Sequence, residues 1–266
     1  MNELDITKVK QFWHNRAQHK ELEEIEITHR DIWQRWLEIE LIKQYLKPNV
    51  RMLDVGCGTG FATRIYSSIV KEIIGMDYDE AMIQRAKNEL KALNKQDSSN
   101  IQFYVQDVLH LSPESFGFFD IALTCRCFIN LKSHMEQRRA IDNITSVLKP
   151  DGHFLFIEGG KKGRTALNTL REAVGLEKMP EVWHNIDFDE EETIQYLKKY
   201  YVIEERLYFG LYDFLSRVVH PLTVAPEQPK YKSKNNEIAA KLNIAMEGFE
   251  NISRIIFLIL RKKDGV

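Results

Sequence analysis

Hydrophobic residues recur at two different spacings along this chain. Within residues 1–47 they return every three or four positions, as Val9, Phe12 and Trp13 do, and this period predicts amphipathic helices. From Arg51 onwards, short apolar runs alternate with further helical repeats. That alternation is typical of strand and helix units wound around a parallel sheet, so we expect an α/β fold preceded by helices.

Five short apolar runs predict the strands of this sheet. They lie at residues 51–55, 72–76, 101–105, 119–124 and 153–158. Asp79 predicts the N-cap of one intervening helix, and Ser133 with Glu136 predicts a capping box at the start of another. Residues 149–152, Lys-Pro-Asp-Gly, predict a turn that leads into the fifth strand.

The C-terminal part of the chain contains two more strand candidates, at residues 200–208 and 252–260. A basic, glycine-rich stretch at 159–164 comes before them, followed by a predicted helix and by a second helix at the acidic run 187–192. The two strand candidates are separated by roughly 40 residues with three prolines, and a connection of that length is usually functional. We interpret residues 210–245 as a lid inserted before the last strand.

Composition and charge favour an ordinary globular protein that acts on small molecules. Of the 266 residues, 44% are hydrophobic and 29% charged, and 37 basic residues against 39 acidic ones leave a net charge of -2. Without a general positive field, neither nucleic acid nor an anionic membrane is an expected partner. The acidic start of the chain lacks the apolar run of a secretory signal, and no stretch reaches the roughly 20 apolar residues of a membrane span. We expect a cytoplasmic protein, whose oligomeric state the sequence leaves open.

The cysteines do not indicate a disulfide framework or a metal site. Cys57, Cys125 and Cys127 are odd in number, which suits free thiols in a reducing compartment. Cys125 and Cys127 are one residue apart but lack the further ligands of a tetrahedral zinc site. We therefore predict no bound metal.

A glycine-rich loop follows the first predicted strand. Glycines stand at positions 56, 58 and 60, and Phe61 and Ile65 then begin the apolar stripe of a helix. Such a loop lets the backbone turn sharply and approach a ligand closely, and the helix N-terminus after it can bind a phosphate or a carboxylate. The dinucleotide pattern G-x-G-x-x-G would require glycine at position 61, where this chain has Phe61.

The string Asp54-Val55-Gly56-Cys57-Gly58-Thr59-Gly60 resembles motif I of the class I S-adenosylmethionine-dependent methyltransferases. The resemblance extends over about residues 50 to 158, because residues 118–121 and 148–152 match the family's fourth strand and the turn before its fifth. It implies a doubly wound, Rossmann-like sheet, S-adenosylmethionine as cofactor, and methyl transfer as the activity.

The resemblance also implies which residues hold the cofactor. Asp77, at the end of the second strand, would accept hydrogen bonds from the ribose hydroxyls, and Asp107, after the third, would accept from the adenine amine. The implied cofactor-binding residues are Asp54, Gly56, Cys57, Gly58, Gly60, Asp77, Tyr78, Asp107, Val108 and Thr124. Each acidic residue also has a structural interpretation: Asp54 as the cap of a turn, Asp77 as an N-cap, and Asp107 as a solvated loop residue.

On this interpretation the chain is a single methyltransferase domain over residues 1–266. Residues 1–47 form a helical cap, residues 48–160 the cofactor-binding core, and residues 161–266 the acceptor-side half with its lid at about 210–245.

Methyl transfer is an in-line displacement, so the protein must mainly position the acceptor, and a hydroxyl acceptor also benefits from a base. In an open parallel sheet the acceptor approaches the carboxyl ends of the strands, where Arg126 and Glu158 stand. His184, in the cluster Trp183-His184-Asn185, has an ordinary pKa suited to a general base. We take His184, Glu158 and Arg126 as candidate catalytic residues, and a purely structural role stays open for each.

The acceptor is the least determined part of the prediction. The pattern D/N-P-P-Y/F of many adenine and glutamine methylases is absent after the fourth strand, which disfavours those acceptors. Lysines at 230, 232 and 234, with Lys161, Lys162 and Arg164, could hold a phosphate or simply form a solvated surface. We expect a small-molecule hydroxyl or amine, with a sugar or nucleotide-linked sugar as one option. The alternatives are a methyltransferase-like scaffold or activator subunit without turnover, and, less favoured by the charge balance, an RNA methyltransferase.

Overall fold

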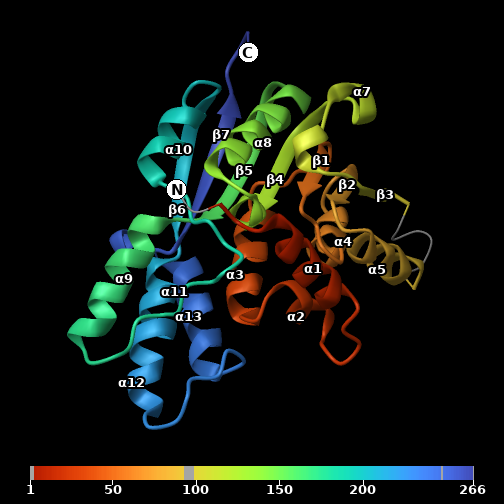
Figure 1. The fold of residues 1–266 in the computed structure, drawn as a ribbon. Coiled ribbons are helices and arrows are strands. Elements are labelled where there is room, and N and C mark those ends of the chain that lie inside the picture. The colour runs from red at the N-terminus through yellow and green to blue at the C-terminus, as the bar shows by residue number, and fades with distance from the viewer. Residues whose placement is uncertain (1–2, 93–98, 247, 266) are drawn as a thin grey trace.

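The computed structural model describes residues 3–92, 99–246 and 248–265 and contains a seven-stranded mixed sheet (Figure 1). The strand order is β3-β2-β1-β4-β5-β7-β6. The strands are β1 (Arg51–Val55), β2 (Glu72–Asp77), β3 (Ile101–Val105), β4 (Phe119–Cys125), β5 (Leu148–Gly159), β6 (Tyr201–Tyr208) and β7 (Ile255–Lys262). The first five pair in parallel, while β7 runs antiparallel to both β5 and β6. The predicted α/β fold with a doubly wound sheet is confirmed.

Most strands begin and end within one residue of their predicted bounds, and two do not. β5 begins five residues early, because Leu148 already pairs with Phe119 ahead of an irregularity in the β4–β5 register. The predicted turn at 149–152 is therefore part of the strand, although the backbone bends there and Asp151 has a φ of 56°. β7 begins three residues late, because residues 250–252 form a 3-10 turn before it.

Two hydrophobic clusters cover the two faces of the sheet. Successive side chains of a strand point to opposite faces, so Met52 belongs to one cluster and Leu53 to the other. The helices are α1 (Ile6–Ala17), α2 (Glu24–Thr28), α3 (Ile32–Lys43), α4 (Phe61–Ser67), α5 (Glu80–Lys91), α7 (Pro113–Phe116), α8 (His134–Val147), α9 (Lys161–Ala173), α10 (Glu190–Leu197), α11 (Gly210–Phe214), α12 (His220–Val224) and α13 (Lys234–Ala245). Helices α3, α4, α5 and α13 contribute to the first cluster, and α8 and α10 to the second.

The predicted N-terminal helical part is confirmed, and the predicted lid is mostly helical too. Helices α1 to α3 and α11 to α13 lie together beyond the carboxyl ends of the parallel strands (Figure 1). α11 continues through a π-helical turn, Leu215–Val219, into α12, and α13 packs against α3. Tyr212 is completely buried. The segment 210–245 is thus built onto the N-terminal helices, because its apolar residues complete the same hydrophobic cluster.

Helix caps follow the sequence in most places. The Asp79 carboxylate accepts a hydrogen bond from Met82 N at 2.9 Å, as its predicted N-cap role requires. Ser133 caps α8 through Glu136 N, but the Glu136 carboxylate accepts from Lys132 N instead of Ser133 N, so the predicted capping box is incomplete. The helix predicted after the basic, glycine-rich stretch at 159–164 is α9, and it already begins within that stretch, at Lys161.

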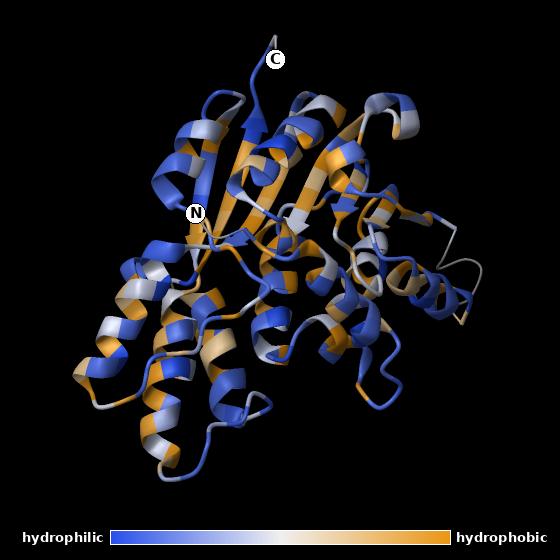
Figure 2. Ribbon diagram, viewed as in Figure 1, coloured by the Kyte–Doolittle hydropathy of each residue, from blue (hydrophilic) through white to orange (hydrophobic). Residues whose placement is uncertain are grey.

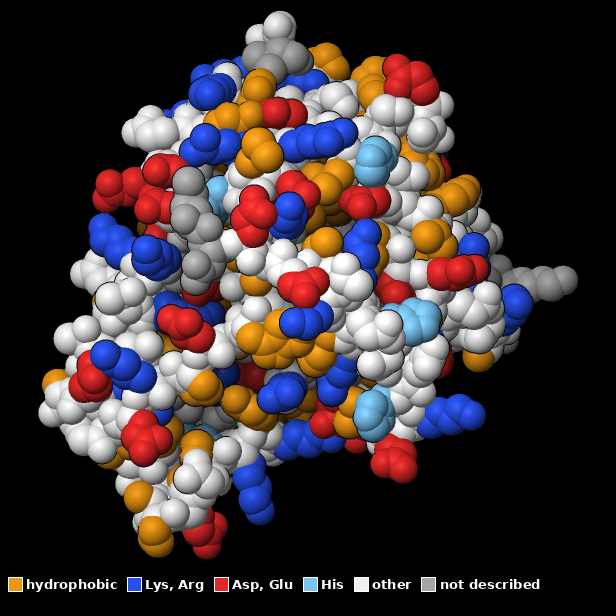
Figure 3. All heavy atoms as spheres, viewed as in Figure 1, with side chains coloured by type: hydrophobic (Ala, Val, Ile, Leu, Met, Phe, Trp, Pro, Cys, Tyr) orange, Lys and Arg blue, Asp and Glu red, His pale blue; other side chains and the backbone are white. Residues whose placement is uncertain are grey.

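The polar and apolar surfaces are arranged as in an ordinary globular fold. The central strands are hydrophobic and the outward faces of the helices hydrophilic (Figure 2). Acidic and basic side chains are interspersed over the face seen in Figure 3. Among the described residues, none of the helices has the length and apolar character that crossing a membrane requires.

Candidate functional site

The glycine loop lies at the carboxyl end of β1, where the strand order reverses between β1 and β4. In open α/β sheets this reversal opens a crevice in which ligands bind. Gly56, Gly58 and Gly60 all have positive φ, at 73°, 56° and 73°. A Cβ on Gly56 would lie 2.5 Å from Cys127 Sγ, so this position also needs glycine for close packing.

Asp54 supports the loop from inside. It is buried at the end of β1, and its Oδ2 accepts a hydrogen bond from Thr63 Oγ1 at 2.6 Å. Because Thr63 belongs to α4, this bond connects the strand before the loop to the helix after it. Burial raises the pKa of the Asp54 carboxyl, and the Thr63 hydrogen bond opposes that rise.

Asp77 joins the end of β2 to the same loop. Its Oδ2 accepts from Gly58 N at 3.0 Å, and its Oδ1 accepts from Asp79 N at 3.0 Å. Burial raises the pKa of the Asp77 carboxyl to about 6. Each carboxylate oxygen can accept more than one hydrogen bond, so the ribose role implied by the sequence stays compatible with these contacts. Asp77 is not an N-cap, because Asp79 occupies that position.

The implied adenine end lies beside these residues and is covered by α1. Asp107 Oδ1 accepts from Leu109 N at 2.9 Å and so caps the 3-10 turn that contains the buried Val108. The Tyr78 hydroxyl is buried without a hydrogen-bond partner among the described residues. Lys10 Nζ of α1 lies 5.2 Å from the Tyr78 ring centroid and 4.0 Å from Asp107 Oδ2.

The N-terminal helices contact the same edge of the sheet as the glycine loop. Trp13 Nε1 donates to Asn130 Oδ1 at 2.8 Å, and His14 Nδ1 lies 3.1 Å from Asp79 Oδ2. A Cβ on Gly58 would lie 2.8 Å from the Thr28 methyl group. The contact of Trp13 with Asn130 could not be predicted from the sequence, because no local pattern relates two positions so far apart in the chain.

Cys57 in the loop has a half-buried thiol. Burial raises its pKa well above the ordinary value, so it remains a thiol and packs as a small apolar group.

Glu158 is the candidate base with the most suitable environment. It lies near the end of β5 with 1% exposure, and its Oε1 accepts from Cys127 N and Phe128 N, both at 3.1 Å. Its Oε2 is buried without a hydrogen-bond partner in the described part of the chain. Burial raises the pKa of this carboxyl to about 8, and the backbone donors and the buried Thr124 hydroxyl offset part of that rise. The group can therefore take or give a proton near neutral pH.

His184 lies in an aromatic cluster with α1. Its ring stacks on Phe12 at a centroid distance of 4.5 Å, and Trp13 and Trp183 pack edge-on around it. Burial, together with the charge of Arg30, lowers the pKa of His184 to about 4. His184 is therefore neutral at pH 7 but a weaker base than an ordinary histidine.

Arg126 directly follows β4 and belongs to a buried polar network centred on Glu38, which is completely buried in α3. Arg126 Nε lies 3.1 Å from Glu38 Oε1, and Arg35 Nη1 lies 3.3 Å from Glu38 Oε2. Burial raises the pKa of Glu38 although Arg35 lies beside it. Sequence analysis missed Glu38. The available signal was a charged residue on the apolar face of a helix, four positions after the buried Gln34.

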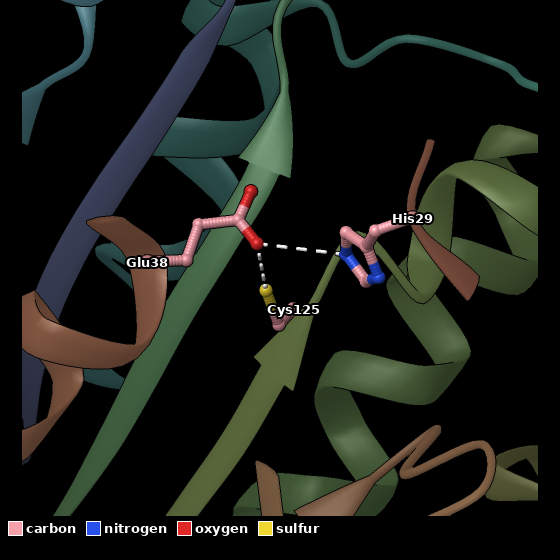
Figure 4. A group of neighbouring side chains, drawn as sticks. All are labelled: His29, Glu38 and Cys125. Carbon is pink, nitrogen blue, oxygen red and sulfur yellow. Dashed lines mark hydrogen bonds and ion pairs between the residues drawn. The ribbon is translucent and has the colours of Figure 1, made fainter. Parts of the chain in front are cut away.

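His29, Glu38 and Cys125 bring three metal-ligand atoms within 4.8 Å of one another (Figure 4). In Figure 4 dashed lines join one carboxylate oxygen of Glu38 to both other side chains. Cys125 Sγ lies 3.3 Å and His29 Nε2 lies 3.5 Å from this atom, Glu38 Oε2. Arg35 Nη1 also donates to Cys125 Sγ at 3.0 Å. The positive guanidinium groups that contact the Cys125 thiol and the Glu38 carboxylate would repel a divalent cation. The three residues are therefore better described as part of the polar network.

Several basic residues considered for phosphate binding have other partners. Lys232 pairs with Glu23 at 3.2 Å and with Glu26 at 3.1 Å, and Arg164 pairs with Asp187. Lys232 thus links the segment 210–245 to the start of α2 through ion pairs. These ion pairs make it less available to bind a phosphate than an unpaired lysine would be.

Comparison with known proteins assigns this chain to a family. A sequence model described as a methyltransferase domain matches residues 46–201. The ubiquinone/menaquinone biosynthesis C-methyltransferase of Ectopseudomonas mendocina (strain ymp) is 30% identical over 152 residues, 56% of this chain and 56% of the relative. The malonyl-(acyl-carrier protein) O-methyltransferase of Bacillus anthracis is 29% identical over 132 residues, 49% of this chain and 45% of the relative. The match to these curated relatives spans about half of their length.

Solved structures share the fold over nearly the whole chain. The N-methyltransferase NodS from Bradyrhizobium japonicum WM9, in complex with S-adenosylhomocysteine, gives a TM-score of 0.56 at 15% identity and covers 96% of this chain and 98% of its own. The magnesium protoporphyrin IX methyltransferase from Synechocystis PCC 6803, with bound S-adenosylhomocysteine, gives 0.57 at 13% identity and covers 96% and 94%. The names of these similar proteins indicate methylation of carbon, of oxygen and of nitrogen. Similarity to them therefore does not show which atom this chain methylates.

Proposed function

Because the chain belongs to the class I S-adenosylmethionine-dependent methyltransferases, we propose that it transfers a methyl group from that cofactor to a hydroxyl or amino group of a small molecule. The observation that carries the proposal is the glycine loop itself, with positive φ at its three glycines and with Gly58 N hydrogen-bonded to Asp77. Sugars and nucleotide-linked sugars are acceptors of this kind.

The residues around the loop fit an adenosyl ligand. The backbone at Gly56 and Gly58 carries no side chain that would exclude it, and Asp77 offers carboxylate oxygens next to the loop. The buried Tyr78 hydroxyl, without a partner among the described residues, supplies a further polar contact on the same side. Asp77, Tyr78 and Asp107 would hold the nucleoside part of the cofactor.

When bound, S-adenosylmethionine supplies a methyl group on a positively charged sulfur. The chain then needs to align the acceptor and exclude water. Helices α1 and α2 would exclude water from the site. The hydrogen bonds of Trp13 with Asn130 and of His14 with Asp79 hold α1 against the edge of the sheet where the glycine loop lies.

Glu158 would remove the acceptor proton. Its raised pKa of about 8 and its unpartnered Oε2 suit a base that operates near neutral pH. An amine acceptor that arrives as an ammonium group must first lose a proton to expose its lone pair, so the same carboxylate serves either acceptor class. His184 remains a second candidate, less suited because its pKa is lowered to about 4.

Calorimetric titration tests the cofactor assignment. The protein is titrated in parallel with S-adenosylmethionine, S-adenosylhomocysteine and NAD, and we expect micromolar binding of the two adenosyl compounds, about -8 kcal/mol. Gly58→Val should abolish this binding, because the Cβ would strike the Thr28 methyl group and block the backbone. Gly175→Val is the matched control, because Gly175 has a positive φ of 79° like the loop glycines but open space around it, so the variant reports the backbone strain alone.

The outcomes separate the possible roles. Binding of NAD alone would overturn the interpretation of the loop. Binding of none of the three would leave the alternative of a scaffold or activator subunit. Binding followed by release of S-adenosylhomocysteine with an added acceptor would establish turnover.

A further inference from the structure

Arg126 has an unusual backbone and an incompletely paired side chain. Its φ is 54°, in the left-handed region that few residues other than glycine adopt. Arg126 N donates to Ile157 O at 2.7 Å and its carbonyl oxygen accepts from Asn130 Nδ2 at 3.2 Å, so neighbouring elements hold this conformation. Nε and Nη2 are both buried, and neither has a hydrogen-bond partner of adequate geometry among the described residues. Strained backbone of this kind is concentrated at functional sites.

Two arginines near Arg126 have carboxylate partners of their own. Arg254 forms a two-pronged contact with Asp213 at 2.8 and 2.6 Å, and Arg217 pairs with Asp31. The charge of Arg254 is therefore compensated by Asp213, and the charge of Arg217 by Asp31.

Glu38 is left to serve both Arg35 and Arg126. Glu158, the other carboxyl that acts on Arg126, has a pKa of about 8 and is mostly protonated at pH 7. Arg126 therefore shares its ion-pair partner, Glu38, with a second guanidinium group. Burial is the main cause of the lowered pKa of Arg126, about 9, and the charges of Arg254 and Arg217 contribute to it.

Arg126 directly precedes the residue that contacts both the glycine loop and the candidate base. The next residue, Cys127, packs on Gly56 of the loop, and its backbone N donates to Glu158 Oε1. On the other side Arg126 contacts α3 through Glu38. A group bound to Arg126 would therefore lie at the acceptor end of the cofactor crevice.

We propose that the acceptor carries an oxyanion, a carboxylate or a phosphate, and that the Arg126 guanidinium binds it. This inference rests on the proposed function, since it names the chemistry of the acceptor. A guanidinium presents parallel N–H donors that match both anions, and a bound anion would satisfy the buried donors. Arg126 is thus a substrate-binding residue in this proposal.

The first test measures anion binding without turnover. The protein saturated with S-adenosylhomocysteine is titrated calorimetrically with inorganic phosphate and, separately, with malonate, at constant ionic strength maintained with chloride. We expect at least one anion to bind the wild type, and binding to weaken about tenfold to a hundredfold in Arg126→Gln, as the loss of a charged hydrogen-bond pair implies. Arg126→Lys should retain part of the affinity, because lysine keeps the positive charge but lacks the parallel N–H donors of the guanidinium group. Arg138→Gln is the matched control, since Arg138 pairs with Glu192 on the surface.

The second test uses acceptors that differ only in the anion. 4-Hydroxybenzoate is compared with its methyl ester, and glucose 6-phosphate with glucose, by release of S-adenosylhomocysteine. Preference for the acid in the first pair would indicate a carboxylate site, and preference for the phosphate in the second a phosphate site. In either case Arg126→Gln should raise KM for the anionic member more than for the neutral member, so that the preference for the anion is lost.

Every outcome of these two tests either supports or contradicts the inference. If neither anion binds, if Arg126→Gln binds both as the wild type does, or if the neutral acceptors are preferred, the inference is wrong. Retained S-adenosylhomocysteine affinity in Arg126→Gln shows that the variant is folded. Failure of the wild type to bind S-adenosylhomocysteine would contradict the proposed function instead, and the two failures are therefore distinguishable.

Discussion

Two carboxyl groups near the ends of the strands have pKa values raised by burial, Asp77 to about 6 and Glu158 to about 8. They titrate on either side of neutral pH, so they separate into two roles. Asp77 is mostly ionised at pH 7 and can accept hydrogen bonds from ribose hydroxyls, whereas Glu158 is mostly protonated and can exchange a proton with the acceptor.

Cofactor affinity should decrease below pH 6 because of Asp77. The folded protein without cofactor favours the protonated carboxyl, so its contribution to stability is present below pH 3.8 and lost as the pH rises through 6. The cofactor requires the ionised carboxylate, so its affinity should fall by up to about tenfold per pH unit below 6. Calorimetry with S-adenosylhomocysteine at several pH values measures this.

Asp77→Asn provides the control for that titration. It should bind the cofactor more weakly at pH 7 and lose the pH dependence. A variant whose affinity declined below pH 6 as steeply as that of the wild type would exclude Asp77 as the titrating group.

Turnover should increase as the pH rises through about 8, because the ionised form of Glu158 is the base. Glu158→Gln keeps the shape and should lower kcat by about a hundredfold or more, with S-adenosylhomocysteine affinity retained. Glu191→Gln, on the exposed side of α10, is the control. An unchanged kcat in Glu158→Gln would remove Glu158 from the mechanism and favour His184.

At the scale of elements, α1 acts as the cover of the cofactor crevice. Its contacts combine hydrogen bonds, of Trp13 with Asn130 and of His14 with Asp79, with a small apolar cluster in which Ala17 and Trp13 meet Met82 of α5. Because this cluster is separate from the two that cover the sheet, we expect that α1 can open without unfolding the sheet. On the proposed function, we expect α1 to slow the release of the cofactor.

Trp13→Phe should increase the rate at which S-adenosylhomocysteine dissociates. The substitution keeps the aromatic contact and removes the hydrogen bond to Asn130, which contributes about 1 kcal/mol, or roughly a fivefold change in rate. Stopped-flow displacement measures the rate. Asn130→Ala should have the same effect, and the double variant should add little to either. Additive effects of the two substitutions would show that the bond does not hold α1 closed.

For the whole molecule, the network around Glu38 joins the N-terminal helices to the segment 210–245 and to β4. Gln34 of α3 donates to Glu38 and accepts from Arg254 Nη2 at 3.0 Å, while Tyr212 donates to Asp31 at 2.7 Å. These bonds connect positions about two hundred residues apart in the chain, such as Gln34 and Arg254, which are separated by 220. The network therefore fixes how the two covering segments meet.

Glu38→Ala should lower the free energy of unfolding by about 3–5 kcal/mol, because it leaves the buried guanidinium groups without their carboxylate. Urea denaturation followed by circular dichroism measures this. Glu192→Ala removes the partner of an exposed arginine and should cost about 1 kcal/mol or less. Equal losses in the two variants would mean that the buried network does not hold the segments together.

Much of the fold could be predicted because its signals are local. The strands β1 to β4 followed from short apolar runs, and Asp79 as an N-cap followed from its position before an apolar repeat. The early start of β5 could not be predicted, because the pairing of Leu148 with Phe119 depends on a neighbouring strand. The prediction of a lid at 210–245 located an insertion but missed that its helices are part of the core.

The sequence by itself determined the cofactor loop, since Asp54, the three glycines and Asp77 lie within 24 consecutive residues and their spacing is a property of the chain. Only the tertiary structure decided the environment of the acceptor. Arg126 and Glu38 come from different elements, and the pKa values of Glu158 and His184 are set by burial against distant segments. Local sequence fixes backbone conformation, whereas desolvation and pairing of charges depend on which distant residues the fold brings together.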